Sequence, residues 1–117
     1  GFTYYDWNVD VDDAGSARTA DKIYNNFVAG IAPKRENVVL MHDGYGHQPT
    51  ADALQGIIDY AKENGYVFSA ITEDTIPVQH GVNNWRAKQK KHDNAIIVFL
   101  LLYWHVDEAK KDYCISD

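Results

Sequence analysis

Residues 37–41 (Asn-Val-Val-Leu-Met) contain four consecutive apolar side chains, and this run constrains the fold more than any other feature of the chain. Strands that are buried on both faces carry such continuous apolar runs, whereas strands with one face in water alternate. In α/β proteins, the layers that cover both faces of a buried strand are helices. The run therefore predicts a parallel sheet with helices packed against it.

Two segments with one apolar face flank this run and are predicted to be helices. The first would have Ser16 as its N-cap and end at Gly30, and the second would begin at Thr50 and end at Asn64 and Gly65. Their apolar stripes consist of Ala20, Ile23, Tyr24, Phe27 and Val28 in the first helix and of Leu54, Ile57, Ile58 and Ala61 in the second.

Two further strands are predicted at residues 4–10 and 66–71. The resulting order β-α-β-α-β indicates an α/β fold with parallel strands joined by crossover helices. The apolar run at residues 96–104 fits either a strand or a buried helix, because periodicity cannot separate the two. We expect one α/β unit over residues 1–76 and an atypical tail, residues 77–117, that packs on this unit or extends it.

Charge and hydropathy exclude two classes of partner. The chain has 117 residues and a formal net charge of -6, with 17 acidic and 11 basic side chains. An acidic protein offers no cationic surface to nucleic acid or to an anionic membrane. The longest apolar run has ten residues, and a membrane-spanning helix needs about 20. We therefore expect neither a nucleic-acid partner nor a membrane span.

Polar side chains follow two of the predicted strands, Asp10 after the first and His42 after the second. The carboxyl ends of neighbouring parallel strands meet at one edge of a sheet, where functional groups collect. A carboxylate beside an imidazole fixes its tautomer and favours its charged form, so the ring can hold and deliver a proton. On spacing alone, the alternative remains open that His42 is a loop histidine and Asp10 a turn former.

Two segments carry a resemblance to a known family. Residues 4–10 (Tyr-Tyr-Asp-Trp-Asn-Val-Asp) and 38–43 (Val-Val-Leu-Met-His-Asp) resemble the fourth and fifth motifs of the polysaccharide deacetylases, the family 4 carbohydrate esterases or NodB-homology family. Residues 50–58 and 64–68 are similar to the helix and strand that follow in that family. The resemblance implies the C-terminal half of a distorted (β/α) barrel, completed by a partner copy or by the C-terminal tail.

The resemblance also implies roles for individual residues. His42 matches the catalytic acid that protonates the amine leaving group when an N-acetyl group is hydrolysed, and Asp10 matches the carboxylate that orients this histidine. Trp7 and Leu40 match the walls of the substrate pocket that receives the acetyl methyl group. Asp13 matches a second acid of the fourth motif, with a role open between chemistry and structure.

The sequence lacks the motifs that carry the family's general base and metal. It contains no Thr-Phe-Asp-Asp segment for the base and no His-x-x-x-His pair for the metal, which is usually zinc. In the complete family enzyme, zinc or another divalent metal polarises the acetyl carbonyl and activates water. We therefore expect the acid half of a hydrolase site and no metal bound by this chain alone.

Two functions stay open at this level. In the first, the chain is a segment of a metal-dependent deacetylase that acts on acetylated polysaccharide or peptidoglycan, with a missing N-terminal half or a second copy of the chain as its partner. The family resemblance would then imply a location at the cell envelope or outside the cell. In the second, the chain is a non-catalytic α/β remnant that binds glycans or serves in assembly.

Overall fold

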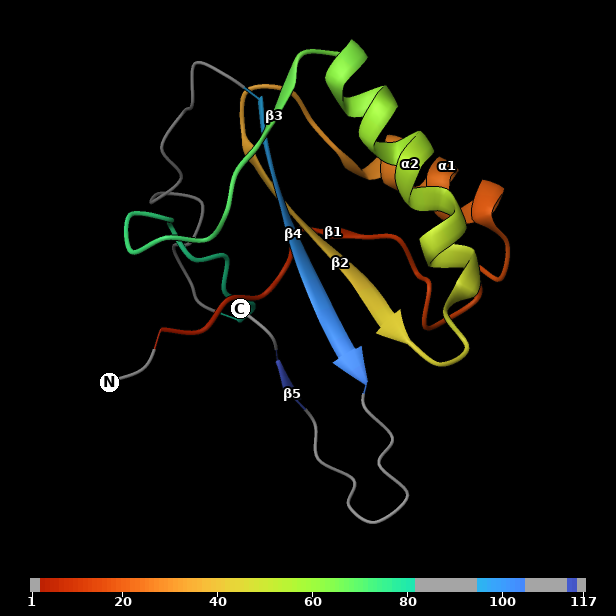
Figure 1. The fold of residues 1–117 in the computed structure, drawn as a ribbon. Helices are drawn as coiled ribbons and strands as arrows, with labels where there is room; N and C mark the ends of the chain where they lie inside the picture. The colour runs from red at the N-terminus through yellow and green to blue at the C-terminus, as the bar shows by residue number, and fades with distance from the viewer. Residues whose placement is uncertain (1–2, 82–94, 105–113, 116–117) are drawn as a thin grey trace.

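The computed structural model of the chain describes residues 3–81, 95–104 and 114–115 (Figure 1). The elements are β1 (Val9–Asp10), α1 (Ala20–Gly30), β2 (Glu36–Gly44), α2 (Gln48–Glu63), β3 (Tyr66–Phe68), β4 (Ala95–Trp104) and β5 (Cys114–Ile115). Strands and helices alternate from β1 to β3 and two further strands follow, which confirms the α/β class.

The strands form one sheet with the order β1-β2-β4-β3, and these four strands are parallel. β4 pairs with the whole length of β2, from Glu36 opposite Ile96 to Gly44 opposite Trp104. β3 and the antiparallel β5 pair with the two ends of β4, on the edge that β2 leaves free. The apolar run at residues 96–104 is therefore a strand, and it lies inside the sheet.

This strand order bears on the expected barrel. In a (β/α) barrel each strand pairs with the next one along the chain, which would place β3 beside β2. Here β4, contributed by the tail, takes that position instead. The sheet formed by the described residues is open, and nothing among them closes it into a barrel.

Both helices lie on the same face of the sheet (Figure 1). Val39 and Met41 of β2 belong to the main core on this face, together with apolar residues of β1, α1 and α2. Val38, which points the other way, packs with Val78 and the half-buried Trp7. All four apolar residues of the run are at most 5% exposed, so the prediction of a strand buried on both faces is confirmed.

The predicted strand at residues 4–10 shrinks to the two residues of β1. The preceding segment lies along residues 75–80, where the Asp6 N–H donates to the Val78 carbonyl at 2.7 Å. His80 closes this contact, because its N–H donates to the Asp6 carboxylate at 2.6 Å. The residues before β1 therefore bind a distant loop through a few polar contacts, and they do not extend the sheet.

The N-terminal boundaries of both helices differ from those predicted. Thr19, and not Ser16, is the N-cap of α1, and its hydroxyl accepts the Lys22 N–H at 3.3 Å. α2 begins at Gln48 after the cap residue His47, which places Thr50 inside the first turn. The predicted end of α2 is confirmed, because Asn64 is the C-cap and Gly65 has a φ of +79°. In the described part of the chain, no helix is long and apolar enough to cross a membrane.

Candidate active site

Side chains extend the short pairing between β1 and β2 at both of its ends. At the start, Asn8 Oδ1 accepts the Val38 N–H at 2.8 Å and Asn8 Nδ2 donates to the Glu36 carbonyl at 2.9 Å. At the end, Asp13 Oδ2 accepts the His42 N–H at 2.7 Å. Asp13 thus takes the place of a backbone acceptor, which brings its carboxylate to the carboxyl end of β2.

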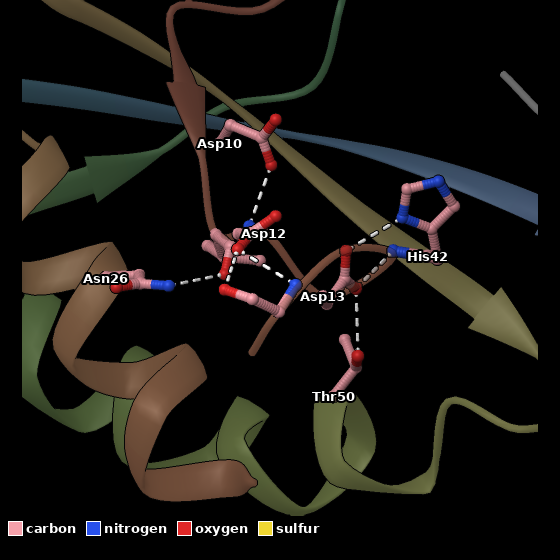
Figure 2. Close-up of polar contacts among 8 residues, drawn as sticks. Asp10, Asp12, Asp13, Asn26, His42 and Thr50 are labelled. Carbon is pink, nitrogen blue, oxygen red and sulfur yellow. Dashed lines mark hydrogen bonds and ion pairs between the residues drawn. The ribbon is translucent and has the colours of Figure 1, made fainter. Parts of the chain in front are cut away.

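The same carboxylate lies within hydrogen-bond distance of the imidazole of His42 (Figure 2). His42 Nδ1 lies 2.7 Å from Asp13 Oδ1, and the Thr50 hydroxyl donates to Asp13 Oδ2 at 2.8 Å. The side chain of Asp13 is fully buried, whereas that of His42 is 17% exposed. An ionised carboxylate only accepts hydrogen bonds, so it assigns the hydrogen to Nδ1 and leaves Nε2 to exchange a proton with another molecule.

A tight loop after β1 turns Asp13 back toward β2. Asp12 adopts the left-handed conformation with a φ of +59°, and its N–H donates to Asp10 Oδ1 at 2.8 Å. Asp12 Oδ2 accepts both the hydroxyl of Ser16, at 2.6 Å, and its N–H, at 3.0 Å. These two bonds, the hydroxyl first, lower the pKa of Asp12. These bonds hold the loop together with a contact from α1, in which Asn26 Nδ2 donates to the Val11 carbonyl at 3.0 Å.

Asp10 does not occupy the predicted position beside His42. It lies opposite Leu40 in the sheet, its side chain is exposed, and its carboxylate caps the Asp12 N–H of the loop. The residue that contacts the imidazole is Asp13, because the turn at Asp12 carries the chain past the edge of β1. The geometry of Asp10 is that of a turn former, and the prediction that it orients His42 is corrected in favour of Asp13.

Trp7, Leu40 and His42 lie on the same side of β2, the side away from the helices. Successive side chains of a strand alternate between faces, so Leu40 and His42 share the face of Val38, and Trp7 packs against Val38. Leu40 is 5% exposed. The Trp7 ring meets the His80 ring edge-on, with centroids 4.7 Å apart. The roles of Trp7 and Leu40 as walls of an acetyl pocket remain predictions.

The loop from β2 to α2 places a second imidazole against His42. Residues 44–47 form a turn in which the His47 N–H donates to the Gly44 carbonyl at 3.2 Å and Gly46 has a φ of +86°. The His47 ring stacks on the His42 ring, with centroids 5.2 Å apart and planes 18° apart. His42 is thus held on one ring edge by Asp13 and on one face by His47.

A metal site cannot be assembled from the described residues. They contain no group of three or more His, Cys, Asp or Glu side chains that is placed to hold a metal ion. The metal implied by the family resemblance therefore has no ligand set in this part of the chain. The chemistry that these residues offer is proton transfer at His42 Nε2.

Fold and site together define a small α/β domain in which a buried aspartate contacts a partly exposed histidine at the carboxyl end of a central strand. Two curated bacterial proteins are similar to the chain. It is 33% identical to the peptidoglycan-N-acetylglucosamine deacetylase of Bacillus cereus, over 80% of this chain and 32% of that protein. It is 31% identical to Bacillus subtilis YheN, whose name assigns it to the polysaccharide deacetylases, over 67% of this chain and 28% of that protein.

The chain thus spans about a third of the length of the curated relatives that it matches. No family model matches the chain. No solved structure matches it either. The similarity supports a relation to polysaccharide and peptidoglycan deacetylases, without extending to their whole length.

Sequence reasoning missed the contribution of Thr50 to this site. The sequence pattern predicts that Thr50 is a helix cap, since threonine is common at such positions. Its contact with Asp13 joins residues 37 apart in the sequence, so no local pattern signals it. The acidic run after β1 was visible, but only the direction of the loop decides which of its carboxylates meets His42.

Proposed function

We propose that this chain is the part of a polysaccharide deacetylase that protonates the leaving group, with His42 as the acid and Asp13 as the carboxylate that orients it. The observation that carries the proposal is the buried Asp13–His42 pair, which directs Nε2 of a partly exposed ring away from its partner. The similarity to proteins named as deacetylases supports the reaction class.

The reaction requires a proton at one defined place. When water attacks the carbonyl carbon of an N-acetyl group, the C–N bond breaks, acetate forms, and the sugar nitrogen leaves as an amine. An unprotonated amide nitrogen is a very poor leaving group, so an acid must donate a proton to it. Protonated His42 donates from Nε2, and Asp13 stabilises the positive charge of the ring through Nδ1, as the carboxylates of other Asp–His pairs do.

Activation of the attacking water lies outside these residues. The Thr-Phe-Asp-Asp and His-x-x-x-His motifs do not occur in the sequence. The proposal assigns them, and the divalent metal that they hold, to a further N-terminal segment or to a partner chain that would also complete the sheet toward a barrel. The substrate would be an acetylated glycan such as a peptidoglycan strand, which places the reaction at the cell envelope.

Complementation tests this proposal. The chain is mixed with a polypeptide that carries the base and metal motifs, and acetate release from an acetylated chito-oligosaccharide is measured. We expect activity only in the mixture, and a loss of about 100-fold or more with His42→Gln, which removes general acid catalysis. Asp13→Asn should lower activity strongly, while Asp10→Asn, the matched control, should leave it near wild type. Equal activities of the wild type and His42→Gln would refute the assignment.

The second candidate is a non-catalytic module that binds glycans or serves in assembly. Its signature would be binding of the chito-oligosaccharide by the wild type and by His42→Gln alike, with no acetate released in any mixture.

A further inference from the structure

We infer that Thr50 is a positioning residue of this site, which acts on His42 through the carboxylate of Asp13. The inference rests on the proposed function for its effect on turnover. The geometry that it describes is nevertheless measurable in the chain alone.

The carboxylate of Asp13 needs an external constraint to keep its orientation. Rotation about the terminal torsion of an aspartate side chain is broad, so the carboxylate does not hold one plane by itself. Two donors converge on Oδ2, the His42 N–H at 2.7 Å and the Thr50 hydroxyl at 2.8 Å. They come from different elements, β2 and α2, and together they leave Oδ1 facing His42 Nδ1.

The Thr50 hydroxyl does not serve its own helix. A serine or threonine within a helix commonly donates to the carbonyl of the preceding turn, and the cap position of α2 belongs to His47. The Thr50 side chain instead reaches a carboxylate 37 residues away in the sequence. Thr50 is only 5% exposed, so this hydroxyl exchanges its partner for water less readily than one at the surface.

The helix that carries Thr50 is anchored in the core. Ala53, Ile57 and Ala61 of α2 are buried against the sheet and α1. The position of the hydroxyl is therefore set by the packing of α2 in the core. Thr50 in turn orients the carboxylate of Asp13, and this carboxylate orients His42. Figure 2 shows Thr50 below the carboxylate and the imidazole on its other side.

The Nδ1–H signal of His42 reports this constraint directly. In the 117-residue chain, ¹⁵N NMR should find the neutral ring of His42 protonated at Nδ1, with a downfield Nδ1–H signal. Thr50→Val keeps the shape of the side chain and removes one of the two donors that fix the carboxylate, so the Nδ1–H signal should broaden through faster exchange with water. Thr50→Ser should restore the wild-type spectrum. Thr19→Val, which removes an exposed hydroxyl at the start of α1, should leave His42 unchanged.

Turnover supplies the second readout. In the complemented system, Thr50→Val should lower kcat about tenfold, by analogy with the lower end of the loss seen when the outer partner of a metal-binding histidine is removed. KM should stay within about twofold, because Thr50 does not touch the substrate. Thr50→Ser should recover most of kcat.

Two results would overturn the inference. One is a folded Thr50→Val variant in which the Nδ1–H signal of His42 has the width and exchange rate of the wild type. The other needs no variant: in the wild type, the Thr50 hydroxyl proton should exchange slowly and lie close to the His42 amide proton, and the absence of that contact contradicts the geometry. Lack of acetate release by the complemented wild type would refute the proposed function alone, because the NMR readouts do not depend on turnover.

Discussion

Replacement of Asp13 by alanine should destabilise the folded chain far more than the same change at Asp10. The two aspartates lie three residues apart and both accept hydrogen bonds within the structure. The Asp13 side chain is fully buried, however, whereas that of Asp10 is exposed. The two alanine variants therefore compare how much a buried and an exposed carboxylate on the same loop contribute to the free energy of unfolding.

The magnitude follows from the donors that each change would leave without a partner. Asp13→Ala orphans the His42 N–H and the Thr50 hydroxyl, and a buried unsatisfied donor costs about 1–3 kcal/mol. The imidazole of His42 is partly exposed and can bond to water, so the sum contains no cost for its Nδ1 group. We expect a loss of about 3 kcal/mol from Asp13→Ala, a large share of the 5–15 kcal/mol typical of a domain. Asp10→Ala should cost less than about 1 kcal/mol, because water replaces one exposed acceptor.

Urea unfolding followed by far-UV circular dichroism measures both free energies. Asp13→Asn refines the comparison, since its amide oxygen can still accept from His42 and Thr50 while its NH₂ faces Nδ1. We expect this variant to keep most of the stability and to force His42 into the Nε2–H tautomer. If Asp13→Ala and Asp10→Ala unfold within about 0.5 kcal/mol of each other, the reasoning about the buried pair is wrong.

Alanine at two helical glycines should act in opposite directions. A Cβ at Gly30 would lie 2.8 Å from Val9 Cγ1, so Gly30→Ala should destabilise the fold by about 1–3 kcal/mol in thermal or urea unfolding. A Cβ at Gly56 would make only ordinary contacts with the Tyr24 ring, so Gly56→Ala should stabilise the fold by about 0.5–1 kcal/mol. Destabilisation by both variants would contradict the prediction. Hydrogen bonds from Ser16 lower the pKa of Asp12 in the folded chain below the usual aspartate value of 3.8. The stability that these bonds add is therefore fully present above pH 3.8 and is lost as the pH falls through the lower pKa of the folded state. Ser16→Ala should therefore be less stable than the wild type at neutral pH, with the difference shrinking in acid, and a difference that is independent of pH would refute this origin.

Local patterns were sufficient for the central elements. The apolar run ending at Met41 predicted a strand buried on both faces, and Val38 and Met41 do lie in different clusters on opposite faces. The stop of α2 at Asn64 and Gly65 was also predicted, because a left-handed C-cap depends on residues next to each other in the chain. Such features are set by side-chain periodicity and by backbone preferences within a few residues.

Helix starts were less predictable, since the same residue types serve several local roles. Ser16 has the chemistry of an N-cap, but its hydroxyl binds Asp12 in the preceding loop, and Thr19 caps α1 instead. Likewise, His47 is the N-cap of α2, and the Thr50 hydroxyl donates to Asp13. In both cases the hydroxyl donates to a carboxylate outside the helix, and the conformation of the loop after β1 decides where that carboxylate lies.

The sequence by itself determined that this chain is an α/β domain with His42 at the carboxyl end of a buried strand and several carboxylates close behind β1. Only the tertiary structure decided that Asp13 holds the imidazole, that Asp10 serves the turn, and that β4 lies between β2 and β3. The physical reason is separation along the chain. The Asp13–His42 contact spans 29 residues and depends on the left-handed conformation of Asp12, and β4 joins β2 through pairing of segments about 60 residues apart.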